Sequence, residues 1–178
     1  MKGYLLLAVS LGLLLHAAPT NAAFVSAELR VNGLSCPFCA FGIEKKLLDV
    51  DGVTDVGVFL DDGRLTLTFE LENAATVSDL EKAVEKAGFK LAALQLTVRG
   101  HLVTDEEGGP RLVASARMRF RLVERRGETT EPISTNTLMR LRESTGQGAG
   151  SMLVSGDVGD RDEEEPTLIV KSAETPRR

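Results

Sequence analysis

Two cysteines separated by two residues are the side chains of this sequence with the clearest chemical potential. Cys36 and Cys39 are the only thiols among its 178 residues. A pair at this spacing can form a redox couple, half of a zinc site, a two-coordinate site for a soft metal ion, or a local disulfide. The residues around the pair must distinguish these four kinds of site.

The thiol pair is predicted to lie where a strand ends and a helix begins. Alternating apolar and polar residues from Ala27 to Gly33 predict a half-buried strand, and apolar residues at helical spacing follow the pair as far as Val50. Pro37 suits the first turn of that helix. Because unpaired N–H groups and the helix dipole favour negative charge there, both sulfurs should ionise more readily than free cysteine.

The other elements of the N-terminal half complete the order βαββαβ. Two strand-like runs, Val53–Leu60 and Leu65–Leu71, are joined by an Asp-Gly turn that is typical of a hairpin. An apolar stripe that starts after Thr76 predicts a second helix, which Gly88 ends, and a last strand covers Leu91–Val98. This order predicts an α+β, ferredoxin-like sandwich with two helices on one face of a four-stranded antiparallel sheet.

The C-terminal half is richer in strands. Strand-like runs and one short helix are predicted at Leu96–Thr104, Arg111–Val123, Asn136–Glu143 (the helix), Met152–Val158 and Thr167–Lys171. These runs, with one helix among them, suit a small OB-like barrel, an architecture of five short strands.

The first 22 residues predict export. Lys2, the apolar run Tyr4–Leu15 and small residues before Ala23 form a secretory signal peptide, and the run is shorter than the roughly 20 residues of a membrane span. Cleavage removes one basic residue from a chain whose formal net charge is already −5. Because the mature protein is acidic and exported, nucleic acid is not an expected partner. We expect a periplasmic or otherwise exported protein whose mature form does not span the membrane.

These patterns divide the chain into four parts. We expect a signal peptide at residues 1–22, a thiol-bearing domain at 23–99, a small β-rich domain at 100–173 and a loose tail at 174–178.

Three of the four kinds of thiol site meet objections from the sequence. A disulfide across so short a loop stabilises a fold by only roughly 2 kcal/mol. A structural zinc site requires four ligands, and the mature chain adds only one imidazole, His101. A thioredoxin-like redox site would need a parallel crossover after the helix, whereas a hairpin is predicted there. Two thiolates on an exposed loop suit a soft ion of low coordination number, Cu(I) or Hg(II), better than zinc.

The N-terminal half resembles the heavy-metal-associated (HMA) domain family, in the manner of its periplasmic mercury-binding and copper-chaperone members. The resemblance covers about residues 27–98 and rests on the segments Gly33–Cys39, Asp51–Val53 and Ala87–Phe89, with apolar residues between them. It implies a βαββαβ fold and a role in binding or passing on a metal ion. The implied partners are a membrane metal transporter or another exported metal-binding protein.

The resemblance also implies roles for individual residues. Cys36 and Cys39 would be the metal ligands, and Phe89 would lie in the loop that faces them. The sequence departs from the family pattern at Leu34, where the family usually has Met, and at Pro37 and Phe38, which make the loop stiffer and more apolar. The C-terminal half has no counterpart in the small members of the family.

Other residues have simpler readings. Arg117, Arg119 and Arg121 alternate with apolar residues, as in any half-exposed strand, although they would also suit an anionic docking partner. His101 has no partner in sequence, and Glu163–Glu165 is expected to be a solvated turn.

The sequence therefore predicts an exported protein that captures or transfers a thiophilic cation, Cu(I) or Hg(II), and that is not an enzyme. The alternative is a periplasmic thiol-disulfide redox protein that uses the same cysteine pair. A third interpretation is an interaction module whose cysteines rest as a disulfide.

Overall fold

The chain folds as two units that share one strand. The structure, a computed structural model, describes residues 24–105, 109–144 and 151–174. The predicted signal peptide at residues 1–22 and tail residues 175–178 lie outside the described residues. Among the helices of the described ranges, none has the length and apolar character needed to cross a lipid bilayer.

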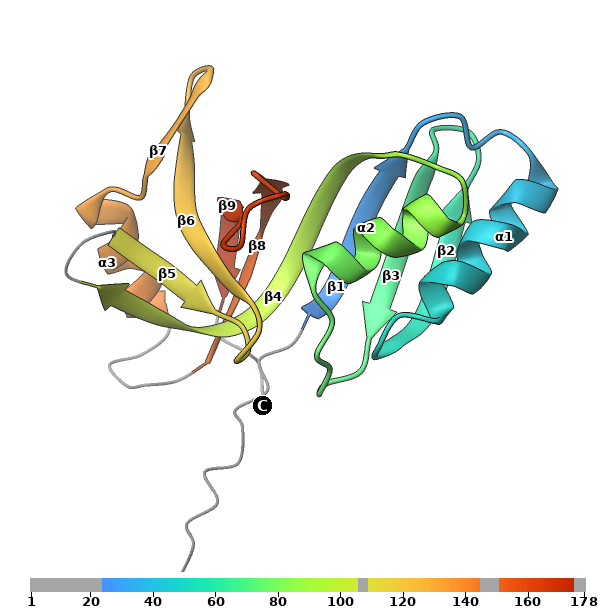
Figure 1. Ribbon diagram of the computed structural model, residues 1–178. Coiled ribbons are helices and arrows are strands. Elements are labelled where there is room, and N and C mark those ends of the chain that lie inside the picture. Colours follow the sequence, from blue (N-terminus) through green and yellow to red (C-terminus); the bar gives the residue numbers. More distant parts are fainter. Residues whose placement is uncertain (1–23, 106–108, 145–150, 175–178) are drawn as a thin grey trace, which may run out of the picture.

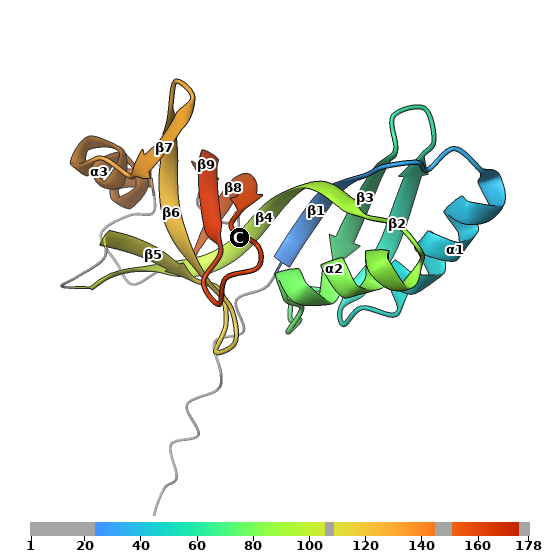
Figure 2. The same ribbon diagram turned by 45° about the horizontal axis from the view of Figure 1, so that its top comes forward.

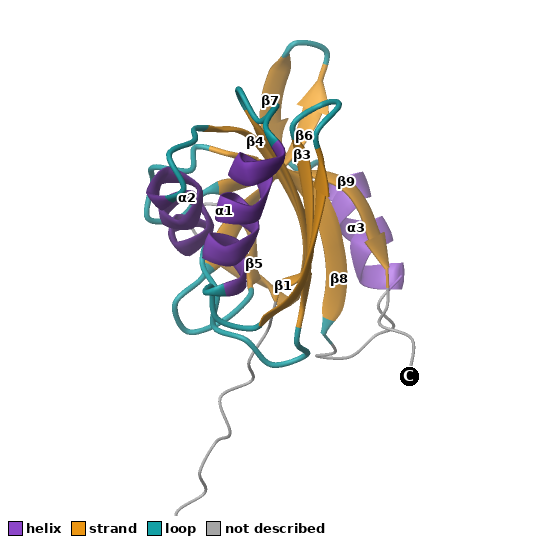
Figure 3. Cartoon of the chain, turned by 90° about the vertical axis from the view of Figure 1, so that its right-hand side faces the viewer, coloured by secondary structure: helices purple, strands orange, loops and turns teal. Residues whose placement is uncertain are grey.

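The N-terminal unit has the predicted order βαββαβ (Figure 1). Its elements are β1 (Phe24–Val31), α1 (Pro37–Leu48), β2 (Val53–Phe59), β3 (Arg64–Phe69), α2 (Val77–Lys86) and β4 (Leu91–Asp105). The strands pair in the order β2-β3-β1-β4, and all three pairings are antiparallel. Both helices cover the same face of this sheet (Figure 3), which confirms the predicted α+β sandwich.

The second helix begins and ends where the sequence predicts. Thr76 and Asp79 form a capping box, in which the Asp79 N–H donates to the Thr76 hydroxyl at 3.2 Å and the Thr76 N–H donates to the Asp79 carboxylate at 3.0 Å. Beyond the C-cap, Gly88 has a φ of 86°, which only glycine adopts readily. These signals fix the length of α2 and the start of the loop that carries Phe89.

Both helices are held on the sheet by apolar stripes. Ile43 and Leu47 of α1 and Leu80 and Val84 of α2 are all 0% exposed. Burying an aliphatic side chain of this size stabilises a fold by about 1.5–3 kcal/mol. The stripe of α1 therefore fixes this helix, and with it the thiol-bearing loop at its start.

The strands of the C-terminal unit form a closed ring that includes β4. Its elements are β5 (Gly109–Val113), β6 (Arg119–Arg126), β7 (Thr129–Pro132), α3 (Thr135–Ser144), β8 (Met152–Gly159) and β9 (Thr167–Glu174). The pairings run β4-β5-β6-β9-β8 and return from β8 to β4, with β6 and β9 parallel. The helix α3 precedes β8, as predicted, and lies on the side of the sheet away from α1 and α2 (Figure 3).

Two details of the C-terminal prediction were wrong. The single run Arg111–Val123 is the hairpin of β5 and β6, closed by hydrogen bonds from the Ala114 and Ser115 N–H groups to the Met118 carbonyl at 3.0 Å. Apolar residues occupy even positions on both sides of this turn, so the alternation hides it. The short strand β7 was missed because its four residues, mostly exposed, carry no apolar alternation.

The strand β4 joins the two units without a linker. It combines the predicted strands Leu91–Val98 and Leu96–Thr104, so the predicted domain boundary near Arg99–Gly100 lies inside it. Between Gln95 and Gly100, the edge of β4 that is not paired with β1 pairs with β8. From His101 onward, β4 pairs with β5. A Cβ at Gly100 would lie 2.7 Å from the Val113 carbonyl oxygen, so glycine permits the close passage of β4 and β5.

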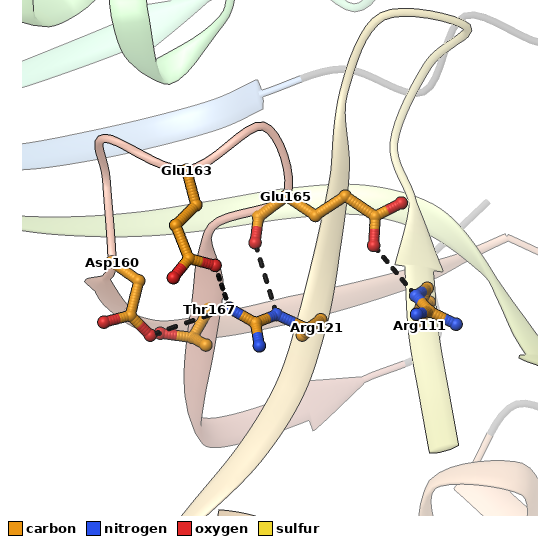
Figure 4. A network of polar contacts seen from close by, with 6 residues as sticks. All are labelled: Arg111, Arg121, Asp160, Glu163, Glu165 and Thr167. Atoms are coloured by element: carbon orange, nitrogen blue, oxygen red, sulfur yellow. Dashed lines mark hydrogen bonds and ion pairs between the residues drawn. The ribbon is translucent and has the colours of Figure 1, made fainter. Parts of the chain in front are cut away.

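The turn between β8 and β9 neutralises arginines on the outer face of β5 and β6. Arg111 donates to the Glu165 carboxylate at 2.9 Å, and Arg121 pairs with Glu163 and donates to the Glu165 carbonyl at 3.3 Å (Figure 4). Asp160 of the same turn accepts a hydrogen bond from Thr167 at 3.1 Å. The run Glu163–Glu165 is thus a turn, as predicted, but Glu163 and Glu165 are ion-paired rather than only solvated.

The same turn also contacts the N-terminal unit. Arg161 donates to the Leu91 carbonyl at 3.2 Å and pairs with Glu81 of α2 at 3.0 Å. In the core, the ring of Phe24 from β1 lies 6.4 Å from that of Phe120 from β6, centroid to centroid. The two units therefore meet through aromatic packing, strand pairing and a charged contact.

Candidate metal centre

The two thiols lie at the start of α1. Cys36 is the N-cap residue, with an extended backbone at φ −113° and ψ 128°, and Pro37 occupies the first helical turn. Cys39 lies within that turn, and the Ala40 N–H donates to the Cys36 carbonyl at 3.0 Å. Both cysteines are free, with Cys36 half-buried and Cys39 exposed. The predicted position at a strand-to-helix junction is confirmed.

The loop before the thiols is shaped by glycine and by a buried side chain. Gly33 has a φ of 81°, which turns the chain out of β1. Leu34 is only 3% exposed and packs in the core, where the sequence predicts an apolar plug. The loop is therefore anchored in the core by Leu34, while Cys39 remains exposed.

The two sulfurs differ in their tendency to ionise, so the prediction that both ionise more readily than free cysteine is wrong for Cys39, whose pKa is raised. Hydrogen bonds from the Cys39 backbone N–H, from the Cys39 thiol and from the Phe38 backbone N–H lower the pKa of Cys36. The hydrogen bond to Cys36, partial desolvation and the negative charge on Cys36 raise the pKa of Cys39. Cys36, the residue at the helix N-terminus, should therefore lose its proton before Cys39.

Exposed aromatic side chains flank the thiols. Phe38, between the cysteines, is 91% exposed, and Phe41, one residue past Ala40, is 70% exposed. Figures 1 and 2 both place the start of α1 at the end of the molecule away from the C-terminal unit. The sequence analysis singled out Phe38 but missed Phe41. Phe41 could have been found because it is an aromatic residue outside the apolar stripe of Ile43 and Leu47.

Phe89 lies in the loop between α2 and β4, as the family resemblance implies. Its side chain is half-buried against the core, and its N–H donates to the Val84 carbonyl at 3.1 Å. Packing at the end of α2 accounts for these contacts.

His101 is not brought to the thiols. In β4 the residue paired with the end of β1 nearest the thiols is Leu91, whereas His101 lies ten residues further along and pairs with Val113. That separation corresponds to about 30 Å along an extended strand. Within the described ranges, no group of three or more His, Cys, Asp or Glu side chains is arranged to hold a metal ion.

The arginines singled out from the sequence lie on or beside β6. Met118, Phe120 and Leu122 are buried between them, which confirms a half-exposed strand. Arg119 is exposed, whereas Arg121 is ion-paired to the β8–β9 turn.

A βαββαβ sandwich with two free thiols at the start of its first helix defines a class of small metal-handling domains. The chain belongs to the heavy-metal-associated domain family, whose model matches residues 28–90. This range ends just before β4, so the C-terminal unit lies outside the family match.

Individual relatives agree with this assignment. The mercuric transport protein periplasmic component of Shigella flexneri is 34% identical over 86 residues, covering 48% of this chain and 93% of that protein. The copper chaperone CopZ of Staphylococcus aureus is 33% identical over 61 residues, covering 34% of this chain and 88% of that protein.

Two further similarities are partial. The copper-exporting P-type ATPase of Bacillus subtilis is 38% identical over 65 residues, which span 36% of this chain but only 8% of the ATPase. The crystal structure of oxidised MerP from Ralstonia metallidurans CH34 is 28% identical and covers 39% of this chain and 96% of that one, with a TM-score of 0.36.

Proposed function

We propose that this protein binds a soft metal ion through the thiolates of Cys36 and Cys39, and that it captures the ion or passes it on. The observation that carries the proposal is a pair of adjacent free thiols, one with a lowered pKa, at the start of α1 in a heavy-metal-associated domain. Soft thiolates favour thiophilic ions of low coordination number, so Cu(I) or Hg(II) is the proposed cargo, with zinc less suited.

Relatives support this proposal. The similar proteins are named as a mercuric transport protein, a copper chaperone and a copper-exporting P-type ATPase. We therefore propose a metal-transfer role without enzymatic activity, with a membrane metal transporter or another exported metal-binding protein as partner. The proposed location is periplasmic or otherwise exported, because of the signal-peptide pattern in residues 1–22.

The decisive experiment is a metal titration of reduced protein. Wild type should bind one Cu(I) or Hg(II) tightly against a competing chelator, whereas Cys36→Ser and Cys39→Ser should each weaken binding by at least about a thousandfold. A two-coordinate site loses half of its ligands in either variant, while an exposed loop contributes little to folding. Ser35→Ala, next to the pair, is the matched control. Wild-type affinity in either cysteine variant would exclude the two-thiolate site.

A thiol-disulfide redox function is the second candidate, because the unequal pKa values of Cys36 and Cys39 are typical of dithiol couples. On the metal-binding proposal, the oxidised protein should pass its disulfide only slowly to a reduced test protein. Rapid, catalytic disulfide transfer that competes with metal binding would favour the redox function instead.

We also propose a role for the C-terminal unit. Its ring of five strands, with a helix before the fourth, resembles an OB-like barrel in strand order. Because it lies at the end of the molecule away from the thiols, its proposed role is the choice of partner rather than metal ligation. Deleting it should change which acceptor receives the metal and should leave the metal affinity nearly unchanged.

A further inference from the structure

A cleft opens between the two units, away from the thiols. It has a volume of approximately 490 Å³ and lies between the C-terminal end of α1, the face of α2 that carries Asp79, Lys82, Ala83 and Lys86, and the turn that joins β5 to β6. Cavities of about 300–1,000 Å³ at the junction of two units are where small ligands commonly bind. The thiols lie at the opposite end of α1, about 18 Å away along a twelve-residue helix.

Basic side chains from three elements converge on this cleft. Lys46 comes from α1, Lys82 and Lys86 from α2, and Arg117 from the β5–β6 turn. Lys82, Lys86 and Arg117 are exposed. In the part of the chain that the structure describes, none of these three has an acidic side chain within ion-pair distance.

The acidic residues of the cleft are already engaged. Asp49 pairs with Lys46 at 3.9 Å. Asp51 accepts a hydrogen bond from the Ala74 N–H at 2.7 Å, and Asp79 serves the capping box of α2. The carboxylates that line the cleft thus have local donors, whereas three of its cations have no acidic partner. Asp51 and Asp79 keep their negative charge in these contacts, so that four cations against three carboxylates give the lining a formal net charge of +1.

We propose that this cleft binds a small polycarboxylate anion. Lys82 and Lys86 are one helical turn apart, with Cβ atoms about 6 Å from each other, and Arg117 of the other unit lines the same cleft. A ligand with two or three carboxylates spaced by several ångströms can place a separate carboxylate on each of the three cations, whereas a monovalent anion has only one carboxylate for all of them. The planar guanidinium of Arg117 also matches a carboxylate in bidentate geometry.

Binding at this cleft would connect the two units. Arg117 belongs to the C-terminal unit, and the lysines belong to α2 of the N-terminal unit. A polyvalent anion held between them adds an inter-unit contact to those of Arg161 and of the β4–β8 pairing. The ligand should therefore stabilise the full chain against unfolding in proportion to its affinity.

The test titrates citrate into reduced, metal-free, full-length protein. Binding is measured by calorimetry at low and at physiological salt. Citrate should bind with one-to-one stoichiometry and raise the melting temperature, and acetate at the same concentration should do neither. The Lys82→Gln/Lys86→Gln double variant should weaken citrate binding by about tenfold, and Arg117→Gln by about fivefold, because exposed ion pairs contribute up to about 1 kcal/mol each.

Matched controls separate a defined site from a general effect of charge. Lys45→Gln and Lys90→Gln each remove one exposed lysine outside the cleft and should change citrate affinity by less than about twofold. Melting curves without citrate establish that every variant is folded. Equal losses in the control and cleft variants would overturn the proposal, as would equal binding of acetate. Tight binding of a glutamate-rich peptide without binding of citrate would also overturn it, in favour of a protein partner.

Discussion

The two units of this protein treat their chemically active side chains in opposite ways. The N-terminal unit leaves its thiols free and surrounds them with exposed aromatic residues, Phe38 and Phe41. The C-terminal unit instead pairs Arg111 and Arg121 with carboxylates of its own β8–β9 turn. The first unit therefore leaves its reactive groups accessible, whereas the second uses much of its charge in contacts that hold its own shape.

The largest effect should come from separating the units. A chain of residues 23–100 keeps all of α1, α2 and the thiols but loses the β8 edge and the Phe120 contact. We expect it to fold marginally, with a free energy of unfolding lower by more than about 5 kcal/mol, the upper end of the cost of losing one buried Phe, and to bind metal within a few-fold of full-length affinity. Urea unfolding followed by circular dichroism, and metal competition, measure the two quantities. A hundredfold loss of affinity in a folded fragment would show that the C-terminal half completes the site.

A smaller but still large effect is expected from a single core residue. Phe120 is 0% exposed and meets Phe24 across the boundary between the units, so Phe120→Ala should destabilise the protein by about 3–5 kcal/mol. Because the contact links both cores, hydrogen exchange should increase in α2 as well as in β6. Faster exchange confined to the C-terminal unit would mean that the two cores are energetically separate.

The charged contact between the units should contribute less, and its contribution should depend on pH. Burial raises the pKa of Glu81, and the positive charge of Arg161 opposes that rise. An acid whose folded-state pKa is raised destabilises the fold increasingly as pH rises through its titration range. Arg161→Gln removes the compensating charge and the hydrogen bond to the Leu91 carbonyl, so it should cost about 1 kcal/mol at pH 7 and less at pH 4.

Urea unfolding of Arg161→Gln and wild type at both pH values measures this difference. Arg30→Gln, which removes one partner of an exposed pair with Asp62, is the control and should show a smaller loss of stability. An Arg161→Gln penalty that stays constant between pH 4 and pH 7 would contradict the assignment to Glu81.

The smallest effect is expected beside the thiols. Phe38 is 91% exposed, so Phe38→Ala should change the free energy of unfolding by less than about 0.5 kcal/mol, in contrast to Phe120→Ala. If the exposed ring instead serves docking, the rate of metal transfer to an acceptor protein should fall while metal affinity stays the same. A clear loss of stability would mean that Phe38 packs against the fold in solution.

Local signals explain why the N-terminal unit could be predicted almost element by element. The Thr76–Asp79 capping box, the turn at Gly63 and the stripe of α1 each act within a few residues of sequence. The thiol pair was found in the same way, because its spacing and its position before a helix are local properties. The sequence could not show how exposed Phe38 and Phe41 are, since the exposure of a side chain depends on the whole fold.

Non-local contacts explain what the sequence left open. The pairing of Gln95 with Asp157 and the contact of Arg161 with Glu81 join segments far apart in the chain, and no short pattern announces them. The convergence of Arg117 with Lys82 and Lys86 is equally non-local, so that the cleft emerges only from the fold. The β5–β6 turn was missed for a different reason, because its apolar alternation continues through the bend.

The shared strand β4 has a consequence for how metal could be delivered. Two modules tied by a flexible linker sample many relative positions, and the effective concentration of one at the other's target falls as the linker lengthens. Here a continuous strand of 15 residues, about 50 Å when extended, replaces the linker. An acceptor held by the C-terminal unit would meet the thiols at one fixed distance and angle. An acceptor whose size matches this distance would meet the metal at a high local concentration. An acceptor of another size would not have this advantage.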